Sequence, residues 1–187
     1  MNSWLRKSIG GTISYEEMNK LAASVPVGSE NLSVLPFGNG AERVLRNVNI
    51  GSSFNGLDLT RHKTPHLCRA VQEGIVFALG YGFDVLNQLG IKSDVIRAGN
   101  ANMFLSEVFC EAFAQITGTE LSLYNTDGAQ GAARGAGVGI GHYATAEEAF
   151  GNLACIRKYE PTKQLSGAYQ DAYGKWKTIL EKQLNTQ

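Results

Sequence analysis

The stretch Asp94–Tyr124, DVIRAGNANMFLSEVFCEAFAQITGTELSLY, changes its pattern twice and decides the fold class. Asp94–Ala98 is short and apolar, which predicts a strand, and Gly99–Asn102 predicts a turn. Met103–Ile116 carries apolar residues at helical spacing, and Glu120–Tyr124 returns to the pattern of a strand. A strand, a turn, a helix and a second strand in this order are typical of an α/β fold.

The turn in this stretch is a candidate binding site. In open α/β sheets, ligands bind beyond the carboxyl ends of the strands, where the following helix also offers free N–H groups. The amides of Asn100 and Asn102 can donate and accept hydrogen bonds, as recognition of a purine or a ribose requires. Turn chemistry alone also favours Gly and Asn, so a purely structural turn remains the alternative.

The segments on either side extend the α/β organisation. A long helix is expected to start at Thr64-Pro65, with Thr64 as the cap, and to stop at Gly90. Short strands are expected at Leu32–Leu35 and Gly51–Leu59, and further helices at Tyr15–Ser24, Gly128–Gly141 and Leu165–Leu184.

The run GAQGAARGAGVGIG, Gly128–Gly141, consists almost entirely of small residues. A dinucleotide-binding interpretation is disfavoured, because the GxGxxG spacing with an acidic residue about 20 positions later is not met. Gly131, Ala132, Gly135 and Gly139 instead predict a helix that packs closely on another element or takes part in a hinge. Direct contact with a ligand is the weaker alternative.

Residues that often build catalytic or metal sites form no such pattern here. The histidines, His62, His66 and His142, share no metal-ligand spacing, so no metal site is expected. Arg69 and Glu73 are four residues apart on the long helix, which predicts a structural salt bridge.

Two further groups of residues have structural interpretations. The three cysteines, Cys68, Cys110 and Cys155, lie far apart in apolar runs, which predicts buried thiols without disulfides. In the loop Gly38–Arg43, Glu42 and Arg43 follow two glycines. The side chains of Glu42 and Arg43 either project into a cleft or form an ion pair on a solvated loop.

The composition limits the classes of function. A length of 187 residues fits one domain or one lobe of a larger protein. The 17 basic and 17 acidic residues cancel, which argues against a nucleic-acid partner. No stretch is long and apolar enough to span a membrane, and no signal peptide is recognisable, so a soluble cytoplasmic protein is expected.

Taken together and in order, these segments resemble the C-terminal half of the FGGY carbohydrate kinases, most closely those that act on xylulose. The match covers nearly the whole chain. The combination of these motifs is specific for the family, although no single motif is. The matching stretches are LPFGNGAER at Leu35–Arg43, FNGLDLTRHKTPHLCRAVQEGIVFAL at Phe54–Leu79, VIRAGNANMFLSEVFCEAFAQITG at Val95–Gly118 and DGAQGAARGAGVG at Asp127–Gly139.

The resemblance implies an actin-like, ribonuclease-H-type lobe with a mixed sheet flanked by helices. It implies ATP, with Mg²⁺, in a cleft between two such lobes. Adenosine would contact Gly99, Asn100, Asn102 and Ser106, and the GL turn at Gly56 would approach the nucleotide from the other side. GNAN stands where the family has GGG, so the approach of the backbone to the base is expected to differ.

The resemblance also implies that residues 1–187 form a single domain that lacks the first strands and the second phosphate loop of that lobe. No phosphate loop or catalytic aspartate is recognisable. No catalytic residue is therefore assigned, and the chain alone is expected to be inactive. The implied reaction phosphorylates D-xylulose to D-xylulose 5-phosphate, with the sugar held mainly by the other lobe. Gluconate, ribulose or glycerol as substrate, a non-catalytic nucleotide- or partner-binding module, and a homodimer remain open.

Overall fold

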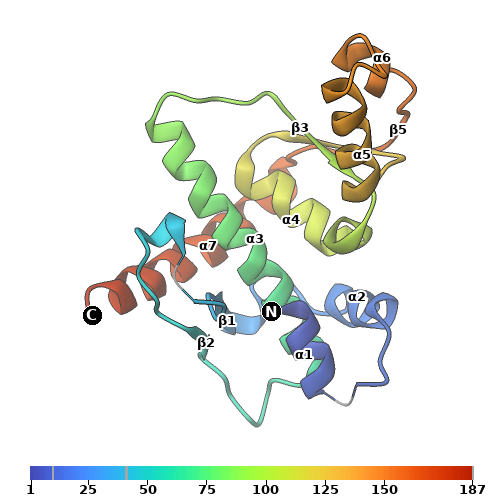
Figure 1. The fold of residues 1–187 in the computed structure, drawn as a ribbon. Coiled ribbons are helices and arrows are strands. Elements are labelled where there is room, and N and C mark those ends of the chain that lie inside the picture. The colour runs from blue at the N-terminus through green and yellow to red at the C-terminus, as the bar shows by residue number, and fades with distance from the viewer. Residues whose placement is uncertain (10, 41, 187) are drawn as a thin grey trace.

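The computed structural model describes residues 1–9, 11–40 and 42–186 (Figure 1). Helices and strands alternate along most of the chain. The helices are α1 (Asn2–Ser8), α2 (Tyr15–Ala23), α3 (Thr64–Gln88), α4 (Glu107–Thr117), α5 (Gly128–Gly139), α6 (Ala146–Phe150) and α7 (Lys163–Leu184). The strands are β1 (Ser33–Pro36), β2 (Ser52–Asn55), β3 (Val95–Gly99), β4 (Glu120–Tyr124) and β5 (Cys155–Tyr159), and short 3₁₀ helices are η1 (Ser29–Asn31), η2 (Arg43–Leu45) and η3 (Asn102–Leu105).

The strands form two separate sheets. β1 and β2 pair antiparallel, while β3 and β4 pair parallel and β4 and β5 pair antiparallel in the order β3-β4-β5. The second sheet is therefore mixed, as expected. Helix α4 is the crossover between its parallel strands. In Figure 1, α3 crosses the middle of the molecule, with β1 and β2 below it and β3 and β5 towards the upper right.

Helix α3 organises the core because it packs against α2, α4 and β1. It begins one residue earlier than expected, so Lys63 rather than Thr64 is its N-cap. Gly90, with φ +78°, follows its end and confirms the predicted stop. Aromatic side chains from α3 and α7 pack around Trp176, which is fully buried and donates its indole N–H to the Val34 carbonyl at 2.8 Å.

Several elements differ from expectation. Helices α1 and α6 and strand β5 have no predicted counterpart. Cys68 and Cys110 are buried free thiols as expected, but Cys155 lies in β5 and is exposed. Burial raises the pKa of Cys68 to about 11 and that of Cys110 to about 12. In the part of the chain that the structure describes, no helix is long and apolar enough to cross a membrane.

The glycine-rich segments also correct the predictions. Ala41 of the loop Gly38–Arg43 lies outside the described residues. Glu42 pairs through its backbone with Val48, and Arg43 begins η2 with an exposed side chain. Among the described residues, Glu42 and Arg43 form no ion pair with each other, and neither lines the cleft beside Gly38 and Asn39.

The close packing predicted for the glycines of α5 is wrong within this chain. A Cβ atom added at Gly131, Gly135 or Gly139 would meet no described atom within 4 Å, and Ala132 is exposed. The packed glycine of this helix is Gly137, where a Cβ would lie 2.8 Å from the Tyr143 ring. The face that carries the small residues therefore has no packing partner among the described residues.

Candidate functional site

The GNAN turn lies where β3 and β4 end side by side. The two strands are parallel, so their carboxyl ends meet at one edge of the sheet. The Asn100 backbone N–H donates to the Tyr124 carbonyl at 2.9 Å, which seats the turn on the end of β4. A Cβ at Gly99 would lie 2.5 Å from the Thr126 carbonyl oxygen, so only glycine allows this approach. The expected location of the turn is therefore confirmed.

Asn102 begins η3 with a positive φ of 54°. Asparagine tolerates this left-handed conformation better than most residues with a side chain. The exposed Asn102 faces a cleft formed with α1 and α2, which we call the amide cleft. Its volume is about 590 Å³, and its lining residues are Asn2, Ser3, Tyr15, Glu16, Asn19, Asn102, Met103 and Leu105.

Three asparagine side chains, Asn2, Asn19 and Asn102, come together in the amide cleft from segments far apart in the sequence. The Asn2 Nδ2 group lies 3.2 Å from the Met103 sulfur, while its Oδ1 atom is buried and has no hydrogen-bond partner among the described residues. A buried acceptor without a partner is costly, so a donor from a ligand would be favourable there. The cleft thus combines polar amides with apolar surface from Met103.

Tyr15 forms part of the wall of this cleft at the start of α2. The Arg6 guanidinium lies 4.9 Å from the centre of the Tyr15 ring. A hydrogen bond with Ser3, together with the charge of Arg6, lowers the pKa of the Tyr15 phenol below its usual value. Tyr15 therefore adds a phenol to the lining of the cleft.

A second cleft, of about 700 Å³, lies on the other side of Gly99 and is called the strand-end cleft. It is bounded by the loop after β4, the first turn of α5 and the region around α6. Asp127 caps α5 by accepting a hydrogen bond from the Gln130 backbone N–H at 2.8 Å. Tyr124 and Phe150 supply aromatic surface to this cleft. The GNAN turn thus separates two hollows, with Gly99 on one and Asn102 on the other.

Two residues expected at the adenosine site lie elsewhere or face inward. Ser106 is 1% exposed, and its hydroxyl caps α4 by accepting from the Phe109 N–H at 3.4 Å. This burial differs from the expectation that Ser106 contacts adenosine. Gly56 follows β2 on the other sheet and lines neither cleft. Its φ of +78° and its close approach to the Asn31 carbonyl oxygen explain the glycine as a turn residue.

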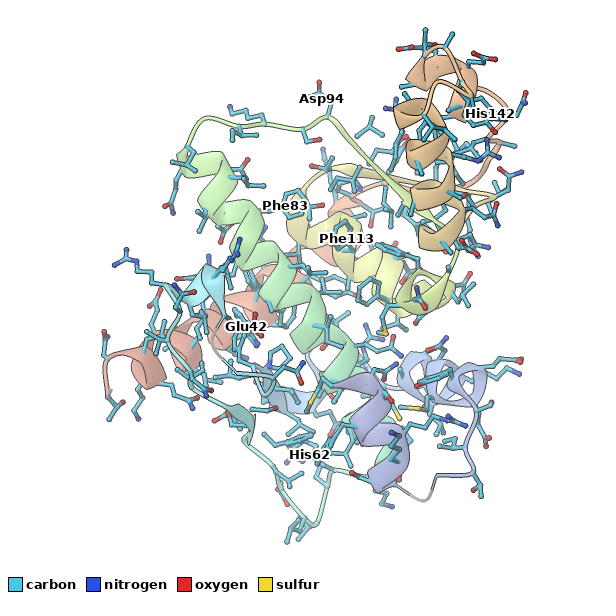
Figure 2. All side chains as sticks on the ribbon, in the orientation of Figure 1. Glu42, His62, Phe83, Asp94, Phe113 and His142 are labelled. Atoms are coloured by element: carbon cyan, nitrogen blue, oxygen red, sulfur yellow. The ribbon has the colours of Figure 1, made fainter. Side chains whose placement is uncertain are left out.

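The described residues contain no group of three or more His, Cys, Asp or Glu side chains arranged to hold a metal ion. His62 and His66 lie 5.3 Å apart between ring centres, whereas His142 lies at the opposite end of the molecule from His62 (Figure 2). These residues therefore do not fit a Mg²⁺ site.

The comparisons with known proteins agree with this arrangement of elements. No protein-family model matches the chain. The chain is 33% identical over 176 residues to the xylulose kinase of Haemophilus influenzae, which covers 90% of this chain and 34% of that relative. The chain thus spans about a third of the length of this curated relative.

Two solved structures share the fold. The xylulose kinase of Rhodospirillum rubrum superimposes with a TM-score of 0.79 over 97% of this chain and 37% of that protein, at 23% identity. The glycerol kinase of Plasmodium falciparum, determined with ADP, gives a TM-score of 0.75 over 97% of this chain and 36% of that protein, at 18% identity. With its α/β fold and mixed sheet, the chain has the actin-like ATPase fold of the sugar kinases, and it resembles about a third of an FGGY-type xylulose kinase.

Proposed function

We propose that this chain is the adenosine-binding part of the C-terminal lobe of a kinase that transfers the γ-phosphate of ATP to a sugar hydroxyl. The observation that carries the proposal is the amide cleft. There Asn102 of the predicted GNAN turn meets Asn2 and Asn19, which come from two other helices. The relatives named above are kinases, and the structure of the glycerol kinase was determined with ADP.

The residues of the amide cleft fit an adenine base. Side-chain amides can both donate and accept, as the edge of adenine requires. The thioether of Met103 and the side chains of Tyr15 and Leu105 offer apolar surface to the faces of a purine. Gly99 lines the strand-end cleft, and the exposed Asn100 directly follows it. These residues would bind and orient the nucleotide, and ATP would supply the phosphoryl group.

The groups that drive phosphoryl transfer are expected outside this chain. Such transfer depends on positioning and on electrostatic stabilisation of the γ-phosphate. No metal-binding cluster is found among the described residues, and no catalytic residue is assigned in this chain. We therefore expect the chain alone to phosphorylate no sugar. In this proposal residues 1–187 form one domain of the longer kinase.

We propose D-xylulose as the sugar, on the basis of the relative that is 33% identical. Gluconate, ribulose and glycerol remain the alternatives, because the sugar would be held mainly by the part of the kinase outside this chain. An assay of a longer kinase that contains this chain, with ATP, Mg²⁺ and each of these acceptors, separates them. Turnover by the chain alone would contradict the division of roles proposed here.

Binding of ADP to the chain tests the nucleotide site directly. We expect backbone amide shifts at Asn2, Asn19 and Gly99–Asn102 in an NMR titration, with a dissociation constant on the order of 1 mM, or about −4 kcal/mol. The variant Asn102→Gly removes the amide but accepts the positive φ. It should weaken binding about two- to tenfold, which corresponds to one hydrogen bond.

Asn47→Gly is the matched control, because Asn47 is also an exposed asparagine with a positive φ, of 64°. It lines neither cleft and should bind ADP as the unaltered chain does. Equal affinities of the Asn102→Gly and Asn47→Gly variants, or shifts confined to residues outside both clefts, would contradict the proposed site.

A further inference from the structure

Gln72 is a fully buried polar side chain on α3, and it lies between the two walls of the amide cleft. Its Nε2 group donates to the Asn19 Oδ1 atom of α2 at 2.9 Å. Its Oε1 atom accepts from the Ser106 hydroxyl at 2.6 Å. Ser106 is the N-cap of α4 and directly follows η3, which carries Asn102. Gln72 thus connects the wall that holds Asn19 with the wall that holds Asn102.

The orientation of the Gln72 amide follows from its partners. The Ser106 oxygen already accepts from the Phe109 N–H, so its hydrogen is available for donation. Turning the amide over would take away the acceptor that Gln72 Oε1 supplies to the buried Ser106 hydroxyl. The amide nitrogen of Gln72 therefore faces Asn19. Asn19 uses its oxygen to accept this hydrogen bond, which leaves its Nδ2 group as the polar end available to the cleft.

We infer that Gln72 is a positioning residue that fixes Asn19 as a hydrogen-bond donor towards the base in the amide cleft. The inference rests on the proposed nucleotide function and adds a specificity to it. The complementary ligand group is an acceptor, and on adenine the acceptors are ring nitrogens. Ser106 then contributes to the site through Gln72, which gives this buried serine a role that does not require contact with adenosine.

Nitrogen-deletion analogues of ADP test this polarity. We would measure the dissociation constants of ADP and of its 1-deaza, 3-deaza and 7-deaza analogues by NMR titration. With the unaltered chain, one analogue should bind about three- to tenfold more weakly than ADP, because it lacks the nitrogen that accepts from Asn19. If no analogue binds more weakly than ADP, the inference is overturned.

Gln72→Glu should abolish this discrimination. Burial raises the pKa of a carboxyl at this position, so the titration is run at a pH high enough to ionise it. The carboxylate then accepts from both Ser106 and Asn19, so the Asn19 amide turns and presents its oxygen to the cleft. The affinity ratio between ADP and the discriminating analogue should then fall to about one. A purely structural role for Gln72 would change all four affinities, or the melting temperature, but would leave the ratio unchanged. That result would also overturn the inference.

A second variant covers the case in which Gln72→Glu does not fold. Asn19→Asp lies at a half-buried position and still accepts from Gln72, but it has no donor for the ligand. It should lose the discrimination as well. Gln115→Glu is the matched control, because Gln115 is a buried amide on α4 that pairs with Thr162 outside the cleft and should keep the ratio.

The outcomes distinguish a failure of the nucleotide site from a failure of the role assigned to Gln72. If the unaltered chain does not bind ADP, the proposed function fails and the inference fails with it. If ADP binds with discrimination, but Asn19→Asp and Gln72→Glu both keep the ratio, only the inference fails.

Discussion

Helices α3 and α5 both carry glycines at several positions, yet the glycines have opposite surroundings. In α3, a Cβ at Gly74 would overlap the Val34 carbonyl oxygen of β1, and a Cβ at Gly80 would overlap the Ile116 side chain. In α5, a Cβ at Gly131 or Gly135 would meet no described atom within 4 Å. Small residues on a helix therefore indicate close packing only where a second element lies against the face that carries them.

The charged residues of the two helices show the same contrast. Arg69 and Glu73 of α3 form an ion pair of 2.8 Å with side chains 7% and 2% exposed. Arg69 also donates to the Val25 carbonyl and to the Tyr169 hydroxyl, and the Gly28 N–H donates to Glu73. On α5, Arg134 is half-buried and donates to the Ala149 carbonyl of α6. Helix α3 thus joins α2, η1 and α7, whereas α5 reaches only its local neighbour.

The largest expected effect is at this buried ion pair. Glu73→Gln keeps the shape of the side chain but leaves the Arg69 charge buried without a counterion. The free energy of unfolding should fall by about 3–5 kcal/mol, measured by urea denaturation. Burial raises the pKa of Glu73, while Arg69 and the Gly28 N–H oppose this shift. A loss below about 1 kcal/mol would mean that the carboxyl is already protonated in the folded protein.

Glu16→Gln is the control for this variant. Glu16 pairs with Lys20 at the same i, i+4 spacing, with a distance of 2.7 Å, but both side chains are exposed. Exposed pairs of this kind contribute little because water and salt screen them. The control should therefore denature at the same urea concentration as the unaltered chain, and a large loss there would contradict the contrast between buried and exposed pairs.

A smaller loss is expected when the close contact of Gly74 is filled. Gly74→Ala places a methyl group against the Val34 backbone, which cannot move aside without disturbing β1. We expect a loss of about 1–3 kcal/mol in the free energy of unfolding, despite the better helix propensity of alanine. Gly82→Ala on the same helix is the control, because its Cβ would meet only the Val44 side chain at 3.9 Å. Equal stabilities of the two variants would refute the packing argument.

The sequence predicts the long elements well because their signals are local. The helices α2, α3 and α7 agree with the predicted ranges to within about two residues, a usual error for element boundaries. Strand β5, CIRKY, is mostly exposed, so it has no alternation of apolar and polar residues to reveal it. Helices α1 and α6 have only 7 and 5 residues, too few for a periodic pattern.

The candidate site is predictable only in part, for a related reason. The turn at Gly99–Asn102 combines strand, glycine and asparagine signals within a few residues. Asn2 and Asn19 lie in the same cleft as Asn102 only because the chain folds that way. No local sequence pattern in α1 or α2 identifies them as site residues. Ser106 is predicted to contact the ligand, but it is a buried N-cap. A serine at the start of a helix is equally compatible with both roles. The burial of Ser106 against Gln72 decides between these roles.

The smallest expected effect tests the open face of α5. Gly135→Ala should raise the free energy of unfolding by up to about 1 kcal/mol, because alanine favours the helix and its methyl group meets no described atom. The melting temperature, read by circular dichroism, should rise slightly. Gly137→Ala is the control within the same helix, since its Cβ would lie 2.8 Å from the Tyr143 ring, and it should lower stability.

If Gly135→Ala lowered the melting temperature as much as Gly137→Ala, the face of α5 that carries Gly135 would be packed after all. The original expectation of close packing along α5 would then be restored. A gain at Gly135 instead restricts that expectation to contacts that only a longer kinase could supply.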